Sequence, residues 1–150
     1  MQRRRTFVLT ALAVTLLGSA MAAGVPQEGG DLVVTVSYTG KVKVDATHQI
    51  WVFLFDSPDI GEGSQPLAVQ AVPKSGGVAT FKGLVKDTVY IAMAFDEKGG
   101  YDGTSGPPPP GTPVAIHIGE TPGAAAPVKV GKGSKVKVSF DDSIRFGQGS

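Results

Sequence analysis

Residues 50–55 read Ile-Trp-Val-Phe-Leu-Phe and are followed at once by Asp56-Ser57-Pro58-Asp59. A run of six apolar residues of β-branched and aromatic type, ended by a polar turn containing proline, is typical of a buried strand. Both faces of such a strand need apolar cover, so we expect it at the centre of the core. This stretch decides the fold class as all-β.

Outward from this strand, the chain carries further short apolar segments with a period of two. The best patterned are 31–38, where Leu32, Val34 and Val36 alternate with polar or smaller residues, and 89–95. Alternation of this kind predicts strands with one buried face. The remaining predicted strands are 67–72, 78–81, 114–118, 128–130 and 135–140.

Seven to eight strands at this spacing predict an antiparallel β-sandwich of the immunoglobulin-like or prealbumin-like kind. The glycine-containing connections 73–77 and 131–134 are interpreted as hairpin turns, each joining the strands on its two sides. No helical pattern is found after residue 23. The composition agrees, with 21 Gly and 11 Pro in 150 residues.

The charge balance favours neither nucleic acid nor an anionic membrane as partner. The chain has 14 basic and 13 acidic residues, and three of the basic ones are Arg3, Arg4 and Arg5. There is no cysteine, so no disulfide and no lipid attachment at a cysteine are expected.

The first residues have the three parts of a secretory signal peptide. Three arginines precede an apolar run from Phe7 to Leu17, and Gly18–Ala22 ends in a small-residue cleavage motif before Ala23. The apolar run is shorter than the roughly 20 residues that span a membrane. We therefore expect a signal-peptide helix in 1–22, a flexible lead-in in 23–30, a β-sandwich domain in 31–142 and a frayed polar tail in 143–150. The mature protein is predicted to be periplasmic or secreted, without stable membrane insertion; an uncleaved anchor and the twin-arginine export route remain alternatives.

One segment resembles a binding site. Residues 96–112 form a predicted long loop, and its first half interleaves acidic residues with glycines and one tyrosine, namely Asp96, Glu97, Tyr101 and Asp102. Carboxylates spaced by glycines suit a hard cation, so calcium on Asp96 and Asp102 is one hypothesis. Asp56, Asp59 and Glu62 would join them if the loops 56–65 and 96–112 lie at one end of the sandwich. Lys98 and Gly100 stand where a complete calcium loop has oxygen ligands, and a plain acidic loop is the alternative.

The aromatic residues offer a carbohydrate-binding alternative, because exposed aromatic rings stack on sugars. Trp51 lies in the most apolar strand and is expected in the core, whereas Tyr101 between Gly100 and Asp102 is the better candidate for an exposed ring. The only histidines, His48 and His117, are expected on the surface. No metal-binding or nucleophile motif surrounds them, and Gly131-Lys132-Gly133-Ser134 departs from a phosphate loop.

The order of features over residues 47–105 resembles the prealbumin-like sandwiches, a group that includes transthyretin-like and carboxypeptidase-regulatory-like domains. The resemblance is closest to small exported bacterial domains of unknown function, and the segments that carry it are IWVFLFDSP, VATFKGL and VYIAMAFDEKGGYDG. It implies a fold and an extracytoplasmic location. The hydroxyisourate hydrolases of this group end in Tyr-Arg-Gly-Ser, whereas this chain ends in Arg145-Phe146-Gly147-Gln148-Gly149-Ser150.

The sequence thus predicts a non-catalytic extracytoplasmic module without a cofactor that binds a protein or glycan partner through loops at one end. A calcium-dependent or carbohydrate-binding domain is the alternative. A transthyretin-like hydrolase is a remote one, and it requires His48, His117 and Arg145 to converge in one cleft.

Overall fold

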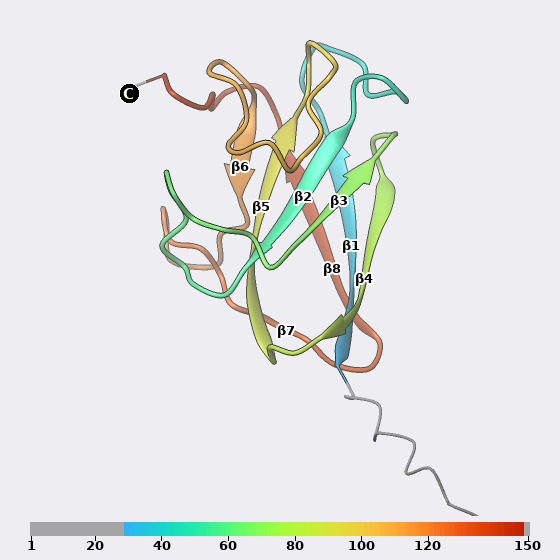
Figure 1. Cartoon of the computed structure of the whole chain (residues 1–150), viewed down its shortest axis with the longest axis vertical. Helices are drawn as coiled ribbons and strands as arrows, with labels where there is room; N and C mark the ends of the chain where they lie inside the picture. The colour runs from blue at the N-terminus through green and yellow to red at the C-terminus, as the bar shows by residue number, and fades with distance from the viewer. Residues whose placement is uncertain (1–28, 149–150) are drawn as a thin grey trace, which may run out of the picture.

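Two β-sheets build the part of the chain that the computed structural model describes, residues 29–148 (Figure 1). No helix occurs in these residues, which confirms the all-β prediction, and none of them forms a segment able to cross a membrane as a helix. The signal peptide 1–22 and most of the lead-in 23–30 lie outside the described residues. The strands are β1 (Gly30–Tyr38), β2 (Ile50–Phe55), β3 (Ala68–Val72), β4 (Gly77–Leu84), β5 (Thr88–Phe95), β6 (Val114–Ile116), β7 (Val128–Lys129) and β8 (Ser134–Phe140).

The core lies between the two sheets. One sheet has the order β4-β1-β8 and the other β3-β2-β5-β6, with β7 paired to β5. Alternate residues of β1 (Leu32, Val34 and Val36) face the inner residues of β2 and β5, and all are almost completely buried. Burial of this apolar surface, at about 25 cal/mol per Å², is the main stabilising term. The period-two pattern therefore identified the inner faces correctly.

The strand β2 is covered on both faces, as its sequence predicts. Its inner residues Ile50, Val52 and Leu54 belong to the main core. Its outer residues Phe53 and Phe55 form a second, smaller cluster with Ala94. Partly buried side chains of the same sheet pack against this cluster, together with Ile60 and Tyr101 from the loops. Two loop side chains therefore add to the apolar cover on the outer face of β2.

One strand pair departs from the predicted antiparallel arrangement. β8 pairs with β1 in parallel, with Leu32 opposite Ser134 and Tyr38 opposite Phe140. All other pairs are antiparallel. Alternation shows which face a residue occupies but carries no information about strand direction. The parallel pairing of β8 with β1 therefore could not be predicted from the sequence pattern.

Neither predicted hairpin forms. β3 pairs with β2 and β4 pairs with β1, so residues 73–76 cross from one sheet to the other. Likewise β7 pairs with β5 and β8 with β1, so the connection 130–133 is a second crossover. Gly76 and Gly133 do adopt positive φ (78° and 76°), but their turns link sheets instead of neighbouring strands.

The predicted frayed tail is wrong for residues 143–148. The backbone N–H groups of Val114 and Phe146 donate to the carbonyls of Ile144 and Thr112, at 3.0 and 2.8 Å, and Gly111 donates to Phe146 at 2.7 Å. Pro113 and Arg145 form an isolated antiparallel bridge. The C-terminal segment 143–148 therefore lies as a strap along residues 111–114.

Candidate functional site

The two loops predicted to share one end leave the sheet at opposite ends. β2 and β5 are antiparallel, with Ile50 opposite Phe95 and Phe55 opposite Tyr90. The loop after Phe55 therefore starts beside the beginning of β5, whereas the loop after Phe95 starts beside the beginning of β2. In Figure 1 the green loop after β2 lies low on the left and the loop after β5 lies at the top. The expected convergence of 56–65 with 96–112 is wrong.

This topology divides the candidate residues. Asp56, Asp59 and Glu62 are exposed in the first loop, whose turn is held by Ser64, which accepts from Gly61 N–H and donates to the Asp59 carbonyl. Asp96, Glu97, Tyr101 and Asp102 stay together in the second loop. The candidate site is therefore built from the second loop alone.

Asp96 anchors the start of that loop. It is 7% exposed, and its N–H donates to the Gln49 carbonyl at 3.0 Å, which continues the ladder between β2 and β5 by one residue. Its carboxylate accepts the N–H of Tyr101 at 2.8 Å. The carboxylate closes a five-residue turn in which Gly99 and Gly100 both have positive φ, a conformation that favours glycine.

Tyr101 fastens the middle of the loop to the sheet. Its ring meets Trp51 edge-on, with centroids 5.7 Å apart and planes at 78°, and its hydroxyl donates to the Gly106 carbonyl at 2.7 Å. Burial, followed by the charges of Asp102 and Asp96, raises the pKa of Tyr101. Tyr101 is half-buried, so its predicted exposure is wrong.

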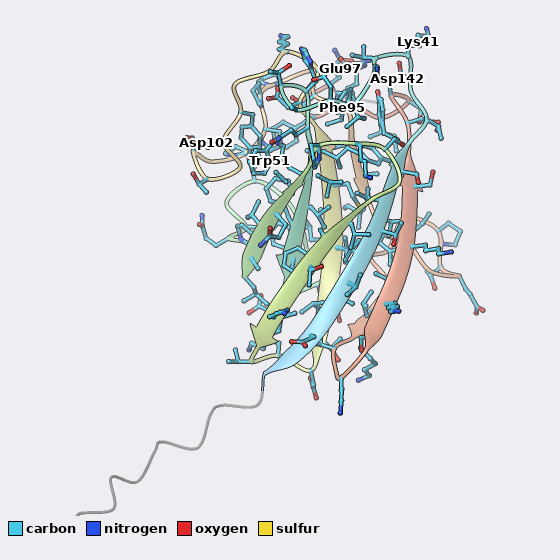
Figure 2. The ribbon with its side chains drawn as sticks, turned by 90° about the vertical axis from the view of Figure 1, so that its right-hand side faces the viewer. Lys41, Trp51, Phe95, Glu97, Asp102 and Asp142 are labelled. Atoms are coloured by element: carbon cyan, nitrogen blue, oxygen red, sulfur yellow. The ribbon has the colours of Figure 1, made fainter. Side chains whose placement is uncertain are left out.

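Trp51 lies on the outer face of β2 under the loop and is half-buried there, outside the main core where the sequence suggested it. Gly103 covers the ring so closely that a Cβ at that position would come within 2.4 Å of it. The indole Nε1 is buried without a hydrogen-bond partner among the described residues. Trp51 therefore serves as the platform on which the loop rests (Figure 2).

Asp102 organises the next turn. Its Oδ1 accepts the N–H groups of Thr104 and Ser105 at 2.9 and 2.8 Å, and its Oδ2 accepts the Ser105 hydroxyl. These hydrogen bonds, with that of the Ser105 hydroxyl first, lower the pKa of Asp102 to about 2. An aspartate that accepts hydrogen bonds from residues two and three places ahead is a common device for fixing a turn.

Glu97 joins this loop to the C-terminal strap, a contact that sequence reasoning missed. Its carboxylate accepts two hydrogen bonds from the Arg145 guanidinium, at 2.8 and 3.2 Å. Arg145 also donates to the Gly111 carbonyl at 2.8 Å and lies 3.5 Å from the Asp142 carboxylate. The hydrogen bond that Arg145 donates to the Glu97 carboxylate raises the pKa of Arg145. Figure 2 shows Glu97 and Asp142 at the end of the molecule opposite to the start of β1.

Tyr38 lies beneath this ion pair. Its ring packs against Phe95 and Phe140, with centroid separations of 4.3 and 5.1 Å, and its hydroxyl lies 3.5 Å from Glu97 Oε1. Burial first, then the charge of Glu97, raise the pKa of Tyr38 to about 12. The phenol is therefore neutral at physiological pH and can donate to the carboxylate.

Between the two halves of the loop lies a cleft of about 270 Å³. Its lining combines carboxylates, hydroxyls, one ammonium group and backbone, contributed by Asp96, Glu97, Lys98, Gly99, Gly100, Tyr101, Asp102, Ser105, Pro109, Gly111 and Thr112. The volume lies just below the 300–1,000 Å³ of common small-molecule pockets. It suits one small polar group, such as a sugar unit or a side chain.

The described residues do not gather a set of three or more Asp, Glu, His or Cys side chains in metal-binding geometry. Asp96 and Asp102, the two residues of the calcium hypothesis, direct carboxylate oxygens at the N–H groups of different turns. The arrangement of these two carboxylates is explained by the loop itself and does not favour a calcium site.

His117 is set apart from Arg145, so the three residues of the hydrolase alternative do not meet in one cleft. His48 lies beside Asp45, with Nδ1 to Oδ1 at 2.9 Å, and hydrogen bonds from the His48 ring and then its N–H hold the pKa of Asp45 well below its usual range. His117 donates its N–H to the Ile91 carbonyl, four residues before Phe95 on β5. At about 3.3 Å per residue, His117 lies roughly 13 Å along the strand from the level at which Arg145 crosses Pro113.

Comparison with known proteins gives no relative for this chain. No family model matches it, no curated protein matches its sequence, and no solved structure matches its fold.

Proposed function

We propose that this protein is a non-catalytic extracytoplasmic β-sandwich module of the prealbumin-like type that binds a glycan or protein partner through the cleft in residues 96–112. The two-sheet architecture and the resemblance over residues 47–105 support the fold type, and the sequence of residues 1–22 supports export. The binding role rests on the construction of the loop.

The observation that carries the binding role is that a long connection is held in one shape from several sides. Residues 96–113 join Phe95 to Val114 without a strand or helix, and connections of this length in small domains usually serve function. Asp96, Tyr101 and Asp102 fix the loop from within, and Arg145 fixes it from the strap. A site ordered before binding saves the entropy of ordering the loop when the ligand arrives.

The chemistry of the lining favours a ligand rich in hydrogen-bond donors. Hydrogen-bond acceptors predominate in the lining: it has carboxylate and carbonyl oxygens and the hydroxyls of Ser105 and Thr112, against the single ammonium group of Lys98. Saccharide hydroxyls, or the amide and hydroxyl groups of a partner's side chain, fit this set. The neutral hydroxyl-rich glycan is the version that we propose to test first.

The experiment is a screen on a glycan array followed by titration of the best binder, comparing the natural protein with a Lys98→Ala/Thr112→Val double variant. Both residues line the cleft, and neither side chain takes part in the hydrogen bonds that hold the loop. We expect the affinity to fall about tenfold, as when two polar contacts are lost. A Thr121→Val variant, in the exposed loop beyond β6, is the control. An array with no binder, or equal affinity for all three proteins, would overturn the proposal.

A further inference from the structure

The outer face of the sheet β4-β1-β8 is bare. The outward side chains of β4 and β8 alternate with the buried ones and are exposed, and those of β1 between them are half-buried. The face consists of Val78, Thr80 and Lys82 on β4, Val33, Thr35 and Ser37 on β1, and Lys135, Lys137 and Ser139 on β8. Figure 2 shows these three strands side by side toward the viewer. The outer face of the other sheet, in contrast, carries an apolar cluster against which the loop residues Ile60 and Tyr101 pack.

The face is positively charged, because its charged side chains are those of Lys82, Lys135 and Lys137. Lys135 and Lys137 are two residues apart on one strand, so their side chains leave the sheet roughly 7 Å apart. Among residues 29–148, no lysine lies within 4.0 Å of a carboxylate. The carboxylate of Asp31 adjoins the face at the start of β1, where its Oδ1 accepts the Gly83 N–H.

The dimensions of the face suit a linear chain. Three strands spaced about 4.8 Å apart give a width of about 10 Å between the outer strands, and a seven-residue strand is roughly 23 Å long. The strip between the outer strand axes is therefore about twice as long as it is wide. A polymer one residue wide covers it well.

We propose that this face binds a linear anionic glycan, along β8 and across β1. The lysine ammonium groups meet the carboxylates or sulfates of the polymer. The hydroxyls of Thr35, Thr80 and Ser139 are within the reach of sugar hydroxyls, and Val33 and Val78 offer apolar contact to the C–H faces of the rings. The face carries no aromatic side chain, so it lacks the stacking platform on which single-stranded nucleic acids bind. This surface is separate from the cleft in 96–112.

The test measures binding of polygalacturonate to the full mature domain by isothermal titration calorimetry at low and at physiological salt. The Lys135→Gln/Lys137→Gln variant is expected to bind about tenfold more weakly and to show a smaller salt dependence. Lys41→Gln/Lys43→Gln is the matched control, because these exposed lysines have the same spacing and the same charge but follow β1 at the other end of the molecule. An equal loss of affinity for polygalacturonate in the two variants would mean that only the net charge of the protein matters, and it would overturn the proposal.

Further arms separate the ligand classes. Neutral dextran should not bind at this face, and a Thr80→Glu variant, which places a carboxylate in the middle of the face, should abolish polygalacturonate binding. Thermal melting checks that each exposed substitution leaves the fold intact. Tighter binding of single-stranded DNA than of polygalacturonate, or no binding of polygalacturonate at low salt, would also overturn the proposal.

Discussion

The guanidinium of Arg145 and the carboxylate of Glu97 form a two-pronged ion pair across 48 residues of sequence, with N to O distances of 2.8 and 3.2 Å. The same guanidinium donates to the Gly111 carbonyl. One side chain of the C-terminal strap thus holds both the beginning and the end of the 96–112 loop, which makes the strap part of the site's construction.

Replacing Arg145 with methionine should release both ends of the loop, because the Glu97 carboxylate and the Gly111 carbonyl each lose a charged donor. We expect the backbone N–H groups of Gly111 and Phe146 to exchange with solvent about tenfold faster, while those of the core strands keep their protection. Hydrogen exchange followed by NMR measures this.

The control for that variant is Lys98→Met. It removes a neighbouring positive charge that makes no ion pair with the described carboxylates. Exchange at Gly111 and Phe146 that is unchanged in Arg145→Met, or equally fast in both variants, would show that the ion pair does not hold the loop.

The raised pKa of Tyr38 leads us to expect a loss of stability at high pH. Its pKa of about 12 in the folded protein lies above the value of about 10 expected when unfolded. The folded state therefore keeps its proton longer, and the stabilisation is complete below about pH 10 and is lost as the pH rises toward 12. Between pH 9.5 and 12 the natural protein should lose about 2 kcal/mol more of its free energy of unfolding than Tyr38→Phe. Urea unfolding measures the free energy of unfolding against pH for both proteins. Parallel curves for the two proteins would contradict the raised pKa of Tyr38.

Gly103→Ala should disturb the platform under the loop. Gly103 has φ of +75°, and an added Cβ would come within 2.4 Å of the Trp51 ring. We expect a loss of about 2–3 kcal/mol, from the positive φ and from the clash, together with a shift of the fluorescence of this single tryptophan.

Gly106→Ala is the matched control for this substitution. Its φ is +103°, and nothing lies within 4 Å of the added Cβ, so only the backbone cost of about 1 kcal/mol should remain, without a fluorescence shift. Identical effects of the two substitutions would mean that the contact with Trp51 contributes nothing.

If the signal peptide in residues 1–22 is removed on export, the N-terminus of the mature protein can be predicted. Intact-mass measurement of the protein recovered from the periplasm or medium should give a chain that begins at Ala23, after the small residues of Gly18–Ala22. Substitution of Ala22 by a bulky residue should slow processing. A chain that retains Met1 and stays in the cytoplasm would contradict the localisation proposed above.

Strand positions were predictable from the sequence, whereas strand partners were not. Ile50–Phe55 was predicted to the residue, and the other strands were placed within a few residues, because alternation reports burial directly. Pairing is set by crossovers between the sheets. The turn around Gly133 has the glycine of a hairpin but connects β7 on one sheet to β8 on the other, and alternation is the same in both cases.

The acidic loop was predicted as the site region, but the roles of its residues were not. Asp96 and Asp102 are acceptors for backbone N–H groups, a use that composition does not distinguish from metal binding. Arg145 was judged only as a possible catalytic residue. The strap gave no burial signal in the sequence, because Ile144 is exposed and backbone hydrogen bonds make the pairing with residues 111–114.

We expect residues 96–112 to be held in one shape before any ligand binds. Backbone ¹⁵N relaxation of the free protein tests it most directly. Order parameters near 0.85 are expected for Tyr101, Asp102 and Gly111, close to those of β2 and β5. Values below about 0.6 across the loop would contradict it, because a loop that moves freely on the nanosecond scale is no preformed cleft.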